Sequence, residues 1–161
     1  MLNNHSRPKR ILIVDDEPTL VFFLKQGLQE AELLCHVDGT SSSEEALTKL
    51  TYNRYDLLIT DLKMPAISGF TLVEVARSLY PGISVIVMTA FGSHEVQNEA
   101  AQLNVDGYLT KPFPTATLHD TATKILLAKD HHQHQLVSEE RLSSSLEKAP
   151  KRGREREGQD I

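Results

Sequence analysis

Residues 57–69 read LLITDLKMPAISG, and this stretch decides the fold class. Its first four residues are apolar or β-branched, which is typical of a strand buried on both faces. The strand ends at Asp61, and Pro65 and Gly69 then mark a loop before residues 69–79, whose apolar side chains recur every three or four residues as in a helix. A buried strand followed directly by a helix is the unit from which parallel α/β sheets are built.

The same alternation recurs along the chain, so we predict five strands, each followed by a helix. The predicted strands are residues 10–14, 33–37, 57–60, 85–89 and 107–109, and the predicted helices are residues 18–30, 43–50, 69–79, 93–103 and 115–128. Pro18 suits a first helical turn, and Ser41–Ser43 offer a helix cap before two glutamates. The sequence therefore predicts a doubly wound five-stranded parallel sheet with five helices.

Length and composition indicate one domain with a tail. The chain has 161 residues, of which 40% are hydrophobic and 24% charged, enough for one core and too short for two ordinary domains. We expect a flexible N-terminus over residues 1–7, a domain over residues 8–128, and a polar tail over residues 129–161 that is partly helical or disordered. The tail's apolar residues keep no sustained heptad, so they do not establish a coiled coil, although a coiled coil is left open.

Charge and hydropathy exclude several function classes. The formal charge is −5, so we expect no direct nucleic-acid binding. No apolar run approaches the roughly 18 residues of a membrane span, and the single cysteine, Cys35, can form no intrachain disulfide. We expect a cytoplasmic protein with no membrane contact.

Polar residues stand where the predicted strands end, which is where open parallel sheets bind their ligands. Asp15 and Asp16 follow the first strand, Asp61 ends the third, Thr89 ends the fourth and Lys111 follows the fifth. Clustered carboxylates suit a hard cation such as Mg²⁺. A carboxylate can also take up a phosphoryl group, provided that the charge on the phosphoryl oxygens is neutralised. Taken singly these residues are ordinary loop acids, caps and surface groups, and only their joint placement favours such a site.

Four motifs give the chain a family resemblance. Residues 11–17 read ILIVDDE, residues 57–69 read LLITDLKMPAISG, residues 85–90 read VIVMTA and residues 108–113 read YLTKPF. In this order and spacing they resemble the response-regulator receiver domain of two-component signalling, over about three quarters of the chain. The resemblance implies a flavodoxin-like sheet with strand order 2-1-3-4-5.

The resemblance also implies which residues carry the chemistry. Asp61 corresponds to the phosphoryl acceptor of the family, and Asp15 and Asp16 to the acidic pair that holds Mg²⁺. Asp61 shares the metal, as does the backbone carbonyl of Lys63, the residue two past the acceptor. Mg²⁺ is thus the expected cofactor.

Two further roles come from the same resemblance. Lys111 corresponds to the lysine that contacts the phosphoryl group, and its bond to Pro112 to a cis peptide bond. Thr89 and Tyr108 correspond to the switch pair, in which the hydroxyl moves toward the phosphoryl group and the ring turns inward behind it.

The implied function is an interaction switch in phosphorelay signal transduction rather than an enzyme with separate substrate turnover. A sensor histidine kinase or a phosphotransfer protein would supply the phosphoryl group, and self-phosphotransfer and autodephosphorylation would be the only reactions. A downstream protein would bind the face formed by the fourth helix, fifth strand and fifth helix, and homodimer formation on phosphorylation is left open. Because residues 89–92, TAFG, resemble receivers of the nitrogen-regulator type, a receiver fragment of a longer transcriptional regulator is the alternative.

Two rival classes fit less well. A metal-dependent phosphatase with an aspartyl-phosphate intermediate usually carries a second aspartate two residues past the nucleophile, where this chain has Lys63. A nucleotide-binding module would need a glycine-rich phosphate loop, GxxxxGK[ST] or GxGxxG, and no predicted strand is followed by one.

Overall fold

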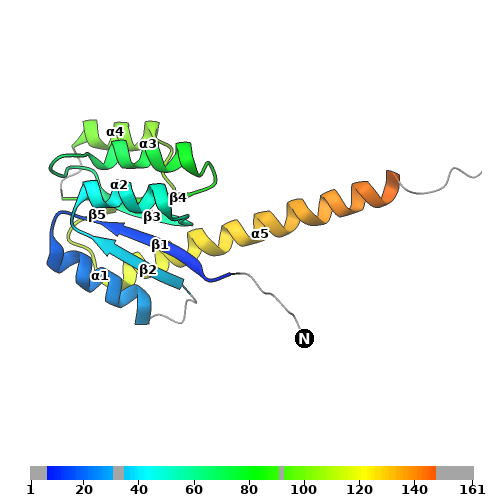
Figure 1. Ribbon diagram of the computed structural model, residues 1–161, viewed down its shortest axis with the longest axis horizontal. Coiled ribbons are helices and arrows are strands. Elements are labelled where there is room, and N and C mark those ends of the chain that lie inside the picture. The colour runs from blue at the N-terminus through cyan, green and yellow to red at the C-terminus, as the bar shows by residue number, and fades with distance from the viewer. Residues whose placement is uncertain (1–6, 31–34, 91–92, 148–161) are drawn as a thin grey trace, which may run out of the picture. The chain divides into compact units, whose positions relative to one another are not determined.

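A computed structural model describes residues 7–30, 35–90 and 93–147 of the chain. Its five strands form one parallel sheet in the order β2-β1-β3-β4-β5, with helices between them (Figure 1). The strands are β1 (Lys9–Val14), β2 (Cys35–Thr40), β3 (Leu57–Asp61), β4 (Ser84–Thr89) and β5 (Gly107–Thr110). The helices are α1 (Pro18–Glu30), α2 (Ser43–Tyr52), α3 (Gly69–Leu79), α4 (His94–Gln102) and α5 (Thr115–Glu147). The predicted fold class and strand order are confirmed.

The sheet separates two apolar layers because alternate residues of each strand point to opposite faces. On one face, Leu58 and Val85 pack with side chains from α2, α3 and α4, and all the buried strand residues there are inaccessible to solvent. On the other face, Ile59 and Ile86 pack with side chains from α1 and from the first turns of α5. Both faces of the central strands are therefore buried, as their continuous apolar runs predict.

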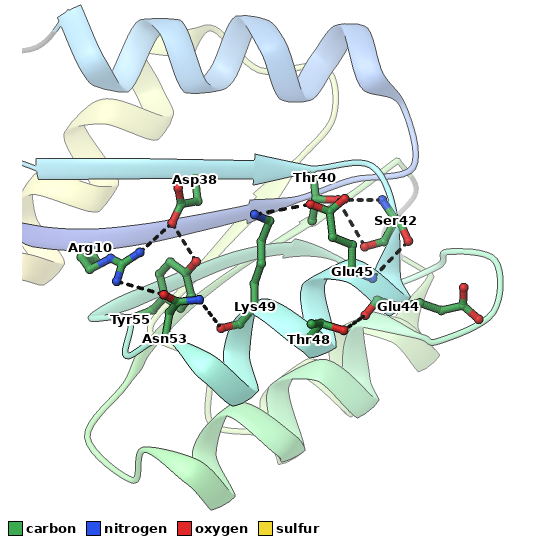
Figure 2. Close-up of polar contacts among 10 residues, drawn as sticks. All are labelled: Arg10, Asp38, Thr40, Ser42, Glu44, Glu45, Thr48, Lys49, Asn53 and Tyr55. Carbon is green, nitrogen blue, oxygen red and sulfur yellow. Dashed lines mark hydrogen bonds and ion pairs between the residues drawn. The ribbon is translucent and has the colours of Figure 1, made fainter.

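The edge strand β2 differs from the prediction. It runs from Cys35 to Thr40, whereas the apolar pattern indicated residues 33–37; of these, Leu33 and Leu34 lie outside the described residues. β2 pairs only with β1, and a strand at a sheet edge needs no continuous apolar run. It therefore includes Asp38, whose carboxylate is hydrogen-bonded by Arg10 and Tyr55 (Figure 2).

The start of α2 has the cap that its sequence predicts. The Ser42 hydroxyl oxygen accepts a hydrogen bond from the backbone N–H of Glu45 at 3.1 Å, and Glu44 and Glu45 lie in the first turn (Figure 2). Acidic side chains at this end of a helix are favourable because the first backbone N–H groups carry partial positive charge. The cap fixes where α2 begins.

The last helix, α5, is longer than the predicted 115–128. The chain divides into two units between Leu127 and Ala128, and in the first unit Leu118, Ala122 and Leu126 of α5 pack against the sheet. In the second unit the side chains of residues 131–145 are exposed. No helix in the described parts of the chain is both long and apolar enough to cross a membrane.

Candidate functional site

The carboxyl edge of the sheet brings two of the predicted site residues together. β1 and β3 are neighbours in the sheet, and Val14 pairs with Thr60. The residues that follow this pair, Asp15 and Asp61, therefore lie side by side. Asp15 is completely buried and Asp61 is 7% exposed. Carboxylates are rarely buried to this extent without a partner, so their surroundings need an explanation.

Asp16 completes a group of three carboxylates. One oxygen from each of Asp15, Asp16 and Asp61 lies within 4.8 Å of the others. We call these three residues the acidic cluster. Asp16 is exposed, so the cluster opens to solvent on that side.

Lys111 joins two members of the acidic cluster. Its ammonium Nζ donates to Asp61 Oδ2 at 2.9 Å and also bonds Asp15 Oδ2. The position of the side chain follows from the backbone, since the Lys111 N–H donates to the carbonyl of Thr89 at 2.7 Å and continues the β4–β5 pairing. The Lys111–Pro112 peptide bond is cis, as the resemblance implied.

The charges of this edge are unbalanced. Among the described residues, one ammonium, that of Lys111, contacts this group of three carboxylates. Burial together with the nearby Asp61 charge raises the pKa of Asp15, although hydrogen bonds from Lys111 and the Glu17 N–H act in the opposite direction. Burial alone would lower the pKa of Lys111, but the two carboxylates outweigh it and raise that pKa, so the ammonium stays charged. An excess of carboxylate oxygens at close range fits a hard dication, which would balance the charge.

The loop after Asp61 contributes a backbone donor. The N–H of Lys63 donates to Asp61 Oδ1 at 3.2 Å, while the Lys63 side chain is exposed. The two oxygens of Asp61 are therefore held separately, Oδ1 by this N–H and Oδ2 by Lys111. The loop returns close to Asp61 at Gly69, where an added Cβ would lie 1.8 Å from the Asp61 carbonyl oxygen, so only glycine fits.

The two residues of the predicted switch pair lie on β4 and β5. Thr89, which is 4% exposed, ends β4 one residue beyond Met88, the partner of Asp61 in the sheet. Tyr108 lies on β5 opposite Val87, and its ring packs against the apolar layer below α2, α3 and α4. Its hydroxyl oxygen is buried and has no hydrogen-bond partner among the residues that the structure describes.

Most of the predicted site residues are thus brought to one edge. Lys111 contacts Asp15 and Asp61, and Asp16 completes the acidic cluster. Thr89 ends β4, the strand next to β3. Phe91 and Gly92 of the TAFG run lie outside the described residues. Sequence reasoning missed Ser43, whose hydroxyl bonds the loop after Asp61; no motif marks it, because the contact spans 22 residues of sequence.

The fold and the site together define a class of protein. It is a flavodoxin-like α/β protein with carboxylates and a lysine at the carboxyl edge of its sheet. Residues 11–123 match the family model of the response regulator receiver domain, and the chain belongs to this family. It is therefore a receiver domain of two-component signalling.

Curated relatives agree with this membership. The transcriptional regulatory protein CusR of Escherichia coli K12 is 33% identical over 111 residues, which are 68% of this chain and 47% of CusR. The DNA-binding transcriptional regulator NtrC of Proteus hauseri is 27% identical over 125 residues, 78% of this chain and 25% of NtrC. The chain thus spans about half the length of CusR and less of NtrC.

Solved structures give the same result for the fold. A CheY-like receiver domain protein from Methanospirillum hungatei superimposes with a TM-score of 0.72 at 29% identity, covering 78% of this chain and 98% of that one. The chemotaxis response regulator CheY4 of Vibrio cholerae gives a TM-score of 0.66 at 30% identity, covering 73% of this chain and 98% of that one. This chain therefore covers almost the whole of each of these two structures.

Proposed function

We propose that Asp61 accepts a phosphoryl group from the phosphohistidine of a sensor kinase or phosphotransfer protein, and that the domain then changes its protein-interaction surface. The observation that carries this proposal is the separate fixing of the two Asp61 oxygens by Lys111 and by the Lys63 N–H, beside two further carboxylates. A carboxylate held in one orientation and close to a cation is prepared for nucleophilic attack on phosphorus.

In the proposed reaction, an Asp61 oxygen forms a bond to phosphorus while the phosphorus–nitrogen bond to the donor histidine breaks. Negative charge collects on the phosphoryl oxygens, and the Lys111 ammonium, which already bonds Asp61 Oδ2 at 2.9 Å, can neutralise part of it without reorganisation. Asp15 keeps Lys111 in place through its own bond to Nζ.

The acidic cluster and the carbonyl of Lys63 would hold Mg²⁺. When bound, this ion supplies positive charge for the acceptor and the phosphoryl oxygens. The fit rests on the donor set: three carboxylates with oxygens within 4.8 Å of one another and one ammonium to oppose them.

Thr89 and Tyr108 are the proposed route from chemistry to surface. A phosphoryl group adds about −1.5 to −2 charges, by analogy with other phosphorylated side chains, which is enough to attract the hydroxyl at the end of β4. Tyr108, half-buried behind it with a buried hydroxyl, would change its packing against the apolar layer. The output face would be α4, β5 and the part of α5 up to Leu127, and a downstream protein is the proposed reader.

We propose residues 8–128 as the receiver domain, with residues 1–7 and 129–161 as flanking segments, in a cytoplasmic protein. The expected absence of direct nucleic-acid contact stays a prediction, as does homodimer formation on phosphorylation. Proteins similar to this chain bear names of transcriptional regulators.

The test compares carboxylates at the two ends of β3. Incubation with Mg²⁺ and a small phosphodonor should add one phosphoryl group to the wild type, measured by intact mass, and none to Asp61→Asn. Asp56→Asn is the matched control, since Asp56 precedes β3, pairs with Arg7 and should leave phosphorylation unchanged. Modification of Asp61→Asn, or of neither protein, would refute Asp61 as the acceptor.

A further inference from the structure

Ser43 is a buried hydroxyl far from the acidic cluster in sequence. It is the first residue of α2 and only 5% exposed, whereas the preceding Ser42 is half-buried and caps the helix. The Ser43 hydroxyl does not cap α2. It donates instead to the carbonyl of Pro65 at 2.8 Å and accepts from the N–H of Ile67 at 3.1 Å.

The two groups that Ser43 contacts define a strained turn. The Ile67 N–H also donates to the Pro65 carbonyl at 2.9 Å, which closes a three-residue turn with Ala66 at its centre. Ala66 has a φ of 68°, and a γ-turn with positive φ at its central residue is rare and strained. Such conformations persist only where surrounding contacts enforce them, and here one hydroxyl contacts both ends of the turn.

This turn belongs to the loop that fixes the acceptor. The loop leaves β3 at Asp61, returns to it where the Gly69 N–H donates to the Leu62 carbonyl at 2.9 Å, and contains Lys63, whose N–H bonds Asp61 Oδ1. Because both loop ends are fixed, the conformation at Ala66 limits how Lys63 can lie. A change in the turn would therefore be felt at Asp61.

We propose that Ser43 is a positioning residue for phosphoryl transfer: its hydroxyl holds the turn at Ala66 and thereby keeps the Lys63 backbone against Asp61. The inference rests on the proposed function of Asp61 and adds a residue that touches neither the metal ligands nor the acceptor. Met64 and Ile67 also pack against the apolar layer and hold the same loop, but apolar packing is non-directional, whereas the two Ser43 hydrogen bonds orient the Pro65 carbonyl and the Ile67 N–H.

The test compares two neighbouring serines. Ser43→Ala removes both bonds to the turn, whereas Ser42→Ala removes the α2 cap and leaves the turn intact. In the unphosphorylated protein, we expect Ser43→Ala to bind Mg²⁺ about three- to tenfold more weakly by calorimetry, the factor that one hydrogen bond is worth. The Lys63 and Ile67 amides should exchange faster with solvent, and Ser42→Ala should change neither result.

A second substitution separates positioning from loss of stability. Glycine adopts positive φ without strain, so Ala66→Gly in the Ser43→Ala background should restore most of the Mg²⁺ affinity, even if Ser43→Ala alone folds poorly. The inference is overturned if Ser43→Ala binds Mg²⁺ like Ser42→Ala, or if the double variant recovers nothing. Neither outcome depends on phosphorylation, so the Asp61→Asn result stands or fails separately.

Discussion

The two ends of the sheet hold carboxylates that differ in burial and in the charges around them. Near the amino ends of β1 and β3, Arg10 Nη2 donates at 3.0 Å and the Tyr55 hydroxyl donates at 2.7 Å to the carboxylate of Asp38 on β2 (Figure 2). This carboxylate faces the Arg10 guanidinium, and Lys49 adds a second positive charge nearby. At the carboxyl ends, the three carboxylates of the acidic cluster face one ammonium, that of Lys111.

The pKa of Asp38 is lowered from its ordinary value, whereas that of Asp15 is raised. Burial acts to raise the pKa of Asp38, but the bonds from Tyr55 and Arg10 outweigh it and the pKa is lowered. Burial also acts on Asp15, and there it prevails over Lys111 and raises the pKa. A partly exposed carboxylate with a lowered pKa stabilises the fold when it is ionised, whereas a fully buried one with a raised pKa is held at a cost and is a candidate for function.

The largest expected effect is on the rate of phosphorylation, and it should distinguish Lys111 from Arg10. Lys111→Met should slow phosphorylation by a small phosphodonor about 10²- to 10³-fold at saturating Mg²⁺, because the transition state loses a preorganised positive charge. Arg10→Met removes the guanidinium that pairs with Asp38 and should lower stability while leaving the rate per folded molecule unchanged. The measurement is the initial rate by intact mass. Equal slowing in both variants would show that the two ends do not differ in role.

A smaller effect should appear in stability against pH. Asp38→Asn should cost about 1–2 kcal/mol in the free energy of unfolding at neutral pH, since a charged hydrogen-bond acceptor is lost from a partly buried network. Because the pKa of Asp38 is lowered in the folded state, the unfolded chain binds its proton first, and this stability is present above the ordinary value of 3.8. The gap between wild type and variant in urea unfolding should therefore shrink as pH falls below about 4. A gap independent of pH would contradict the assignment.

The sheet and the acidic cluster were predictable because each depends on local pattern and on one general rule. Apolar runs mark strands, and parallel strands end at the same edge, so Asp15 and Asp61 had to approach each other once β1 and β3 were neighbours. The bounds of α1 and α3 agree with the prediction, and their starts carry recognisable signals, Pro18 in the first turn of α1 and the Ser68 cap of α3.

What the sequence did not reveal depends on distant partners or on the absence of pattern. β2 extends through Asp38 because Arg10 and Tyr55 meet its carboxylate, and neither is nearby in sequence. α5 continues past residue 128 through a mostly polar segment that keeps no apolar stripe but includes good helix formers such as glutamate and leucine. The contact of Ser43 with Pro65 accompanies a positive φ at Ala66. Because Ala66 is not a glycine, the sequence gives no signal of this backbone conformation.

The smallest expected effect is that of Asp15→Asn, the same aspartate-to-asparagine change at the carboxyl end of the sheet. Its effect on stability should have the opposite sign to that of Asp38→Asn. In metal-free protein at neutral pH, Asp15→Asn removes one of three crowded carboxylates and keeps a side-chain oxygen for the Glu17 N–H, so the free energy of unfolding should rise by about 0.5–1 kcal/mol. The folded state raises the pKa of Asp15, which means that the ionised form opposes folding above the ordinary value of 3.8 and that asparagine removes this cost.

Mg²⁺ should then reverse the order of the two proteins. At a free concentration tenfold above its Kd, Mg²⁺ should stabilise the wild type by about 1.4 kcal/mol and the Asp15→Asn variant by much less, because the variant has lost a ligand. Urea unfolding with chelator and with Mg²⁺ measures both values, and Asp38→Asn is the control that should respond to Mg²⁺ like the wild type. If Asp15→Asn instead destabilised the metal-free protein as Asp38→Asn does, the carboxylates at the two ends of the sheet would both be structural, and the unbalanced charge of the acidic cluster would no longer indicate a metal site.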